Sequence, residues 1–161
     1  MYKRQLYAYN DLNHKTFVDD WLEEFAGYIH MDADNFWGKL LEDENVHGVY
    51  CNGHARRKFE AVKKQAKKQG LAHEALRYYK KLYRIERRAK DEGMSVEQRY
   101  QLRQAESKPI LVEYKKWLDE KYSTVLPKSP LGKAFKYSLN HWPELIAVSY
   151  THLTLPTTPY V

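Results

Sequence analysis

Asp32 occupies a position suited to chemistry, because it stands at the end of a predicted β-strand. Residues 28–32 read Tyr-Ile-His-Met-Asp and follow Gly27, a residue typical of turns. In open α/β sheets, ligands bind outside the carboxyl ends of the strands, and a carboxylate there suits a hard cation such as Mg²⁺. The alternative is an exposed aspartate at a strand end, which is common in α/β folds. On its own, the residue fits that alternative better.

Cys51 and His54 are metal-ligand residue types at metal-ligand spacing. A structural zinc ion needs four ligands, and the chain has one cysteine, so the others would have to be histidines or carboxylates from elsewhere. The ligand count favours the alternative, a buried thiol beside a hydrogen-bonding histidine.

Arg56, Arg57 and Lys58 follow directly and open a predicted helix. Guanidinium groups bind phosphate well, which suggests contact with DNA. Cations at a helix N-terminus are disfavoured by about 0.3–1 kcal/mol, a cost that phosphates or nearby carboxylates can offset. The pattern fits a DNA-binding strip and a solvated helix start equally well.

Two strands must position Asp32 and Cys51. The second strand candidate covers residues 48–51, and residues 36, 40 and 41 between the strands are apolar at near-helical spacing. A β-α-β unit of this kind is nearly always right-handed, with its two strands parallel. We also expect an amphipathic helix over residues 17–25 and the end of an earlier strand at residues 6–9.

Residues 55–142 show helical periodicity almost throughout. Glycine, proline and capping residues divide this region into five predicted helices. The first two cover residues 55–69 and 71–92, and the third begins at Ser95 with a capping box that includes Gln98. The fourth has Pro109 near its first turn, and the fifth follows Ser129 and stops at Pro143. Residues 143–161 show no helical period.

The composition excludes several classes of protein. The 161 residues suffice for one domain, and the mean hydropathy of −0.79 with no long apolar run argues against a membrane protein. A single cysteine fits a reducing compartment, so we expect a cytoplasmic location. The formal charge of +6 permits a polyanionic partner without requiring one.

Three ordered segments resemble the transposases of the insertion sequence 66 family. Residues 25–32 resemble the segment that ends in the second catalytic aspartate of that family. Residues 51–59 resemble its string C-W-A-H-A-R-R-K-F, and residues 126–134 resemble L-P-K-S-P-L-G-K-A. The match continues to Pro143 and ends near Ala147.

The resemblance implies a DDE-type DNA transposase and an α/β fold: a partial RNase H-like core with a short parallel strand pair, followed by a mostly α-helical insertion. In such enzymes three acids hold two divalent ions, Mg²⁺ or Mn²⁺, which activate water and then the freed 3′-hydroxyl group for attack on phosphodiesters. Asp32 would be the second acid and a metal ligand. The implied partners are DNA at transposon ends and target sites, with a homo-oligomer compatible with the full-length protein.

The chain also departs from the family pattern. The family usually continues D-G-Y-x-G-Y, whereas residues 32–37 read Asp-Ala-Asp-Asn-Phe-Trp, and Asn52 and Gly53 replace the usual Trp and Ala. The first and third acids lie outside the resemblance, and Glu144 aligns too early to be the third. We therefore expect the chain to be inactive alone and to bind no metal ion by itself.

Both ends resemble translations of one sequencing-library adapter, read from opposite strands. The expected division is an adapter-derived artefact at residues 1–5, the partial catalytic core at 6–54, the helical insertion at 55–147 and a second artefact at 148–161. Leaving out Lys3 and Arg4 lowers the formal charge from +6 to +4.

Two alternatives to a transposase fragment remain open. One is a non-catalytic helical module that binds nucleic acid, or a transposase relic, with steep salt dependence and no metal requirement. The other is a purely structural helical domain. The transposase interpretation requires the two strands to be parallel and adjacent, with Asp32 near the start of the first helix, whereas the purely structural alternative has no such requirement.

Overall fold

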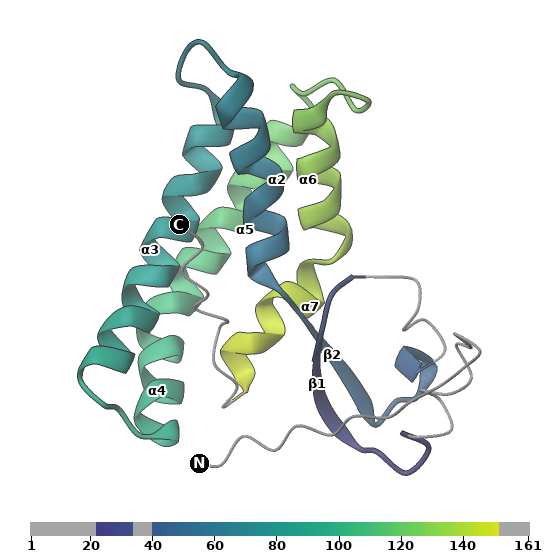
Figure 1. Cartoon of the computed structure of the whole chain (residues 1–161), viewed down its shortest axis with the longest axis vertical. Helices are drawn as coiled ribbons and strands as arrows, with labels where there is room; N and C mark the ends of the chain where they lie inside the picture. The colour runs from purple at the N-terminus through teal and green to yellow at the C-terminus, as the bar shows by residue number, and fades with distance from the viewer. Residues whose placement is uncertain (1–21, 34–39, 152–161) are drawn as a thin grey trace.

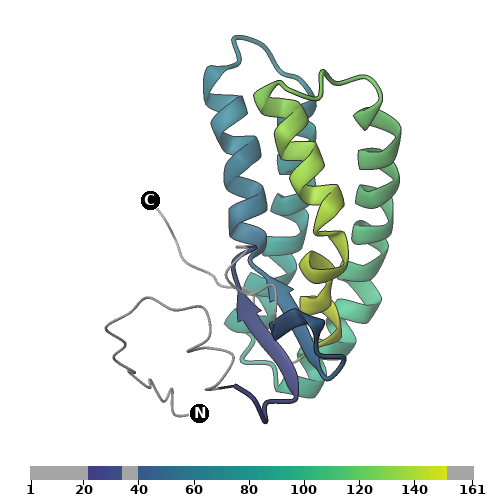
Figure 2. The same ribbon diagram turned by 90° about the vertical axis from the view of Figure 1, so that its right-hand side faces the viewer.

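The computed structural model describes residues 22–33 and 40–151 (Figure 1). The described elements, in chain order, are β1 (Gly27–Met31), η2 (Leu40–Glu42), β2 (Val46–Tyr50), α2 (Asn52–Gln65), α3 (Leu71–Asp91), α4 (Val96–Leu102), η3 (Arg103–Ser107), α5 (Lys108–Tyr122), α6 (Pro130–Asn140), α7 (Trp142–Ile146) and η4 (Ala147–Tyr150). Helices α2, α3, α5 and α6 form an antiparallel bundle, and the two strands lie at one end of it (Figures 1 and 2). The described chain is therefore mostly helical with a small sheet, consistent with an α/β class. Within it, every helix is too short or too polar to span a bilayer.

The two predicted strands are present, parallel and adjacent. Their register pairs Gly27 with Val46 and Met31 with Tyr50. β1 begins one residue earlier than expected, and β2 is displaced two residues toward the N-terminus at its start. Between the strands only η2, a 3-10 helix, is described. The predictions for residues 6–9, most of 17–25 and residue 36 lie outside the described residues.

The first helix begins three residues earlier than predicted, because β2 passes directly into it. Cys51 is the N-cap residue, and the buried side chain of Asn52 donates a hydrogen bond of 2.8 Å to the Leu145 carbonyl. The helix also ends at Gln65 rather than at residue 69. Continuing it would place the lysines at 63–67 and 64–68 in repulsive i, i+4 pairs.

The prediction of separate third and fourth helices is wrong, because the chain stays helical from Val96 to Tyr122. A π-helical segment, η3, joins α4 to α5 and ends two residues before Pro109. Proline lacks an N–H group, and its ring clashes with the carbonyl four residues earlier, so a wider turn accommodates it. The capping box at the start of α4 is confirmed: the Ser95 hydroxyl accepts from the Gln98 N–H, and the Ser95 N–H donates to the Gln98 side chain.

The prediction that residues after 142 lack helical structure is also wrong. The fifth predicted helix ends at Asn140, but α7 and η4 continue the chain to Tyr150. Pro143 lies in the first turn of α7, where its missing N–H group has no intrahelical acceptor to lose. The sequence pattern therefore predicted correctly that a helix ends just before Pro143, but not that further helical segments follow.

One aromatic ring from each long helix fills the centre of the bundle. Phe59, Tyr79, Tyr114 and Phe135 are all at most 2% exposed. The ring centroids of Phe59 and Phe135 are 5.7 Å apart, and those of Tyr79 and Tyr114 are 5.5 Å apart. Their edge-to-face contacts are a preferred arrangement for aromatic pairs. The helical spacing of Tyr79 indicated a core position, and the structure confirms it.

Replacing Gly132 with alanine is expected to lower the free energy of unfolding by about 3 kcal/mol, at the upper end of the range for overpacking. A Cβ atom at Gly132 would lie 2.2 Å from the Leu126 carbonyl oxygen and 2.8 Å from that of Pro127. The backbone cannot retreat easily, because the Gly132 N–H donates to the Ser129 hydroxyl. Urea denaturation measures the change. Gly70→Ala is the control, since its Cβ would meet open space, and similar losses for both variants would contradict the argument.

Candidate functional site: Asp32 beside the start of the first helix

Strand pairing places Asp32 next to the start of α2. Asp32 follows the carboxyl end of β1, and the Cys51 N–H donates a hydrogen bond of 3.2 Å to the Met31 carbonyl. In the first turn of α2, the His54 Nδ1 atom lies 2.7 Å from the Asp32 Oδ1 atom. The sequence treated Asp32 and the Cys51–His54 pair as separate candidates. The structure brings all three together in one site.

The three side chains of this site present one ligand atom each. These atoms, from the Asp32 carboxylate, the Cys51 thiol and the His54 imidazole, all lie within 4.8 Å of one another. Cys51 and His54 are half-buried, whereas Asp32 is exposed. The His54 Nδ1 atom is shielded from solvent and makes no hydrogen bond of good geometry to the described residues. Cys51 is thus half-buried rather than buried, and His54 faces Asp32 at ion-pair distance.

The site lies in the positive field of a helix N-terminus. The first turn of α2 contains no acidic residue, so Asp32 supplies a negative charge from the neighbouring strand. Burial, together with the charge of Asp32, raises the pKa of Tyr137 on α6 to about 12. Burial lowers the pKa of His30, and the charge of Asp32 opposes that shift. A carboxylate near a helix N-terminus is stabilising, an effect opposite in sign to that of the basic residues that open α2.

The donor set of this site does not fit a complete Mg²⁺ site. Mg²⁺ demands oxygen ligands in near-octahedral geometry. Among the residues that the structure describes, the cluster provides one carboxylate, accompanied by a thiol and an imidazole. Further carboxylates would have to come from elsewhere for Asp32 to take part in Mg²⁺ or Mn²⁺ binding.

The three predicted DNA-binding residues point to different neighbours. Arg56 pairs with Glu60 at 2.6 Å and lies over the ring of Tyr83 on α3. Lys58 lies over the ring of Tyr137 on α6, at 4.4 Å from its centroid. Arg57 is exposed. Arg56 and Lys58 therefore lie against different helices, α3 and α6.

A basic groove of about 370 Å³ lies between α2 and α3. Its walls are formed by Arg56, Glu60, Lys63, Leu76, Lys80, Tyr83, Arg84 and Arg87. Sequence reasoning included Arg56 but missed the contribution of α3. The signal that could have found it is the helical spacing of the basic residues at positions 80, 84 and 87, which share one face of α3.

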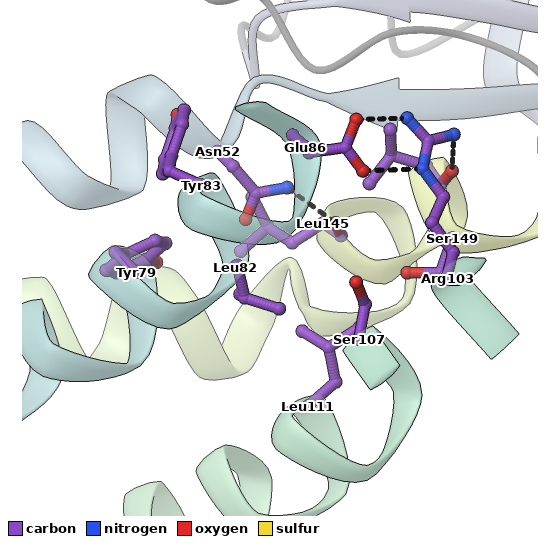
Figure 3. Close-up of a pocket in the computed structure, with 11 residues that line it drawn as sticks. Asn52, Tyr79, Leu82, Tyr83, Glu86, Arg103, Ser107, Leu111, Leu145 and Ser149 are labelled. Carbon is purple, nitrogen blue, oxygen red and sulfur yellow. Dashed lines mark hydrogen bonds and ion pairs between the residues drawn. The ribbon is translucent and has the colours of Figure 1, made fainter. Parts of the chain in front are cut away.

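The enclosed cavity near the lower end of the bundle is not a ligand site. Its volume is about 20 Å³, which is room for about one water molecule. Beside it, Arg103 and Glu86 form a buried two-pronged ion pair with distances of 2.7 and 2.8 Å (Figure 3). Arg103 also donates to the carbonyls of Val148 and Thr151. Sequence patterns did not predict this pair, since neither residue belongs to a recognisable motif.

Comparison with known proteins places the chain in a family. The model of the Transposase IS66 family matches residues 2–156, and the chain therefore belongs to this family. It is similar to two proteins of Sinorhizobium fredii (strain NBRC 101917 / NGR234), each named only as an uncharacterized protein. Identity to y4jD is 36% over 133 residues, covering 78% of this chain and 25% of that protein. Identity to y4hP is 33% over 105 residues, covering 58% and 19%.

The chain thus spans at most about a quarter of the length of these relatives. No solved structure matches it significantly. The family resemblance that the motifs indicated is confirmed, but the expected end of the match near Ala147 is not, because the matched region begins at residue 2 and runs to residue 156.

Proposed function

We propose that this chain is part of a DNA transposase that cuts and rejoins phosphodiester bonds at transposon ends, with Asp32 as one of its catalytic carboxylates. The observation that carries the proposal is the place of Asp32 at the carboxyl end of a parallel strand, beside the start of α2. Family membership supports the reaction class. An RNase H-like core completed by segments outside the described residues is part of the proposal.

The chain alone is proposed to be inactive, because a DDE-type reaction needs three acids and the described cluster contains one carboxylate. The remaining acids would come from other parts of a longer protein, as the length of the relatives suggests. We therefore assign the catalytic activity to the complete protein. To the helical region we assign the role of positioning the DNA. The division of the chain at residues 5, 54 and 147 stays a prediction.

The test of this proposal is a transposition assay with the complete coding sequence that contains this chain. The gene is supplied with its flanking genomic DNA on a donor plasmid, and excision and insertion are counted by sequencing. Products whose junctions coincide with the ends of the element support the proposal. Their absence, under conditions where a known transposase is active, would contradict it.

The basic groove between α2 and α3 favours a second candidate function, a non-catalytic module that binds nucleic acid. Its cations can contact phosphates, and Tyr83 lies among them. This function predicts DNA binding without strand transfer. The same groove would serve the transposase as a contact surface, so binding alone does not separate the two functions, whereas the transposition assay does.

Replacing Lys80, Arg84 and Arg87 together with alanine is expected to weaken DNA binding by the chain at least tenfold. Removing up to three phosphate contacts should also lower the slope of log K against log salt by about 2–3. Fluorescence anisotropy over a salt series measures both. All three side chains are exposed, so the fold should not change. The charge-matched control is alanine at Lys108, Lys116 and Lys128, outside the groove, and equal losses in both variants would exclude the groove as the binding surface.

A further inference from the structure

We propose that Asp32, Cys51 and His54 form a binding site for a transition-metal ion such as Zn²⁺ or Co²⁺. The thiolate, the imidazole Nδ1 atom and one carboxylate oxygen would be its three protein ligands. This site goes beyond the proposed transposase function, because it takes an ion of a different chemical class from Mg²⁺.

The donor set selects the class of ion. Thiolate and imidazole ligands suit Zn²⁺ and its transition-metal neighbours, whereas Mg²⁺ and Ca²⁺ take oxygen ligands. Catalytic-type zinc sites commonly have three protein ligands, with water in the fourth position. Because Asp32 is exposed and the other two residues are half-buried, solvent can reach that fourth position.

The spacing of the ligand atoms is close to that of a formed site. Bonds of about 2.0–2.3 Å in a tetrahedral zinc site place neighbouring ligand atoms about 3.3–3.7 Å apart. The three atoms here lie within 4.8 Å of one another, and the Asp32–His54 pair is at 2.7 Å. Binding therefore requires adjustments of about 1 Å, which side-chain rotation can supply.

The surrounding backbone holds the ligands in place. The hydrogen bond from the Cys51 N–H to the Met31 carbonyl fixes the strand end that carries Asp32 against the start of α2. His54 is one helical turn from Cys51, on the same element. Gly53 leaves one side of the sulfur open, because a Cβ atom there would lie 3.3 Å from the Cys51 Sγ atom.

An ordinary ion pair explains less of the geometry than a metal site. It would account for the 2.7 Å approach of the His54 Nδ1 atom to Asp32, but not for the Cys51 thiol, whose sulfur lies within 4.8 Å of both groups. A metal ion satisfies all three groups at once. Its binding would also engage Asp32, and only this consequence for activity rests on the proposed function.

The test is a Co²⁺ titration of the 161-residue chain after removal of metal with EDTA and dialysis. We expect one Co²⁺ per chain, with a near-ultraviolet thiolate-to-cobalt charge-transfer band and the visible absorption of four-coordinate Co²⁺. Added Zn²⁺ should remove both bands. The measurement involves no DNA and no activity, so its failure leaves the transposase proposal intact, and the reverse also holds.

Variants assign the ligands. Cys51→Ser should abolish the charge-transfer band, and His54→Ala and Asp32→Asn should each weaken Co²⁺ binding at least tenfold. His47→Ala, at an exposed histidine of β2, is the control and should bind as the parent does. Circular dichroism verifies that each variant is folded. Absence of a band in the parent chain, or unchanged affinity in either His54→Ala or Asp32→Asn, would overturn the three-ligand site.

Discussion

Replacing Asp32 with asparagine is expected to lower transposition by the complete protein about a thousandfold, because losing a metal-holding carboxylate removes several kcal/mol of transition-state stabilisation. Asparagine keeps the size and shape of the side chain but removes its negative charge. A thousandfold loss corresponds to about 4 kcal/mol of transition-state stabilisation, which an exposed residue without a catalytic role would not supply. Counting of excision and insertion products for the two proteins, expressed at equal levels, measures the change.

The matched control for this substitution is Asp91→Asn, at an exposed position in the last turn of α3. It makes the same chemical change far along the chain from the site and should leave transposition within about twofold. The variant His54→Ala distinguishes the effect of the Asp32 charge from the effect of its contact with His54, since it removes the histidine while keeping the carboxylate. Activity of the Asp32→Asn protein within tenfold of the parent would contradict a catalytic role for this residue.

Local patterns were sufficient to predict the strand pair and most of the helices, but not the continuity from α4 to α5 or the helical structure of α7 and η4. The capping box at Ser95 and the cap at Ser129 placed two helix starts correctly, because both depend on hydrogen bonds within four residues. The prediction of parallel strands followed from the near-helical spacing of apolar residues between them, which is typical of a β-α-β unit, and the pairing confirms it. The start of α2 was predicted three residues too late. Local patterns do not show that the side chain of Asn52, in the first turn, donates a hydrogen bond to the carbonyl of Leu145, which is far away in the sequence.

The candidate site could be predicted only in part, because it too depends on contacts between residues far apart in the sequence. Asp32 was singled out by its strand end, and Cys51 and His54 by their spacing, but their meeting depends on the register that pairs Met31 with Tyr50. Register is set by pairing across the sheet, which periodicity along one strand does not specify. The basic face of α3 was overlooked because its residues border a groove only when α2 packs alongside.

Replacing Arg103 with methionine is expected to lower the free energy of unfolding by about 3–5 kcal/mol, the range for breaking one half of a buried ion pair. Arg103 and Glu86 are 1% and 3% exposed. The substitution would leave the Glu86 carboxylate buried with Arg99 as its remaining cation, at 3.5 Å. It would also leave the Val148 and Thr151 carbonyls without this donor. Urea denaturation with an unchanged m-value measures the loss.

A double variant, Glu86→Leu with Arg103→Met, separates the cost of an unpaired charge from the value of the pair itself. Because the buried charge is removed together with its partner, at least half of the lost stability should return. The surface control is Arg88→Met, which breaks an exposed ion pair with Glu106 and should change stability far less than Arg103→Met does. If Arg103→Met cost no more than Arg88→Met, the pair would have to be solvated in solution. The contacts of Arg103 in η3 with the carbonyls of Val148 and Thr151 would then be less well ordered than their burial implies.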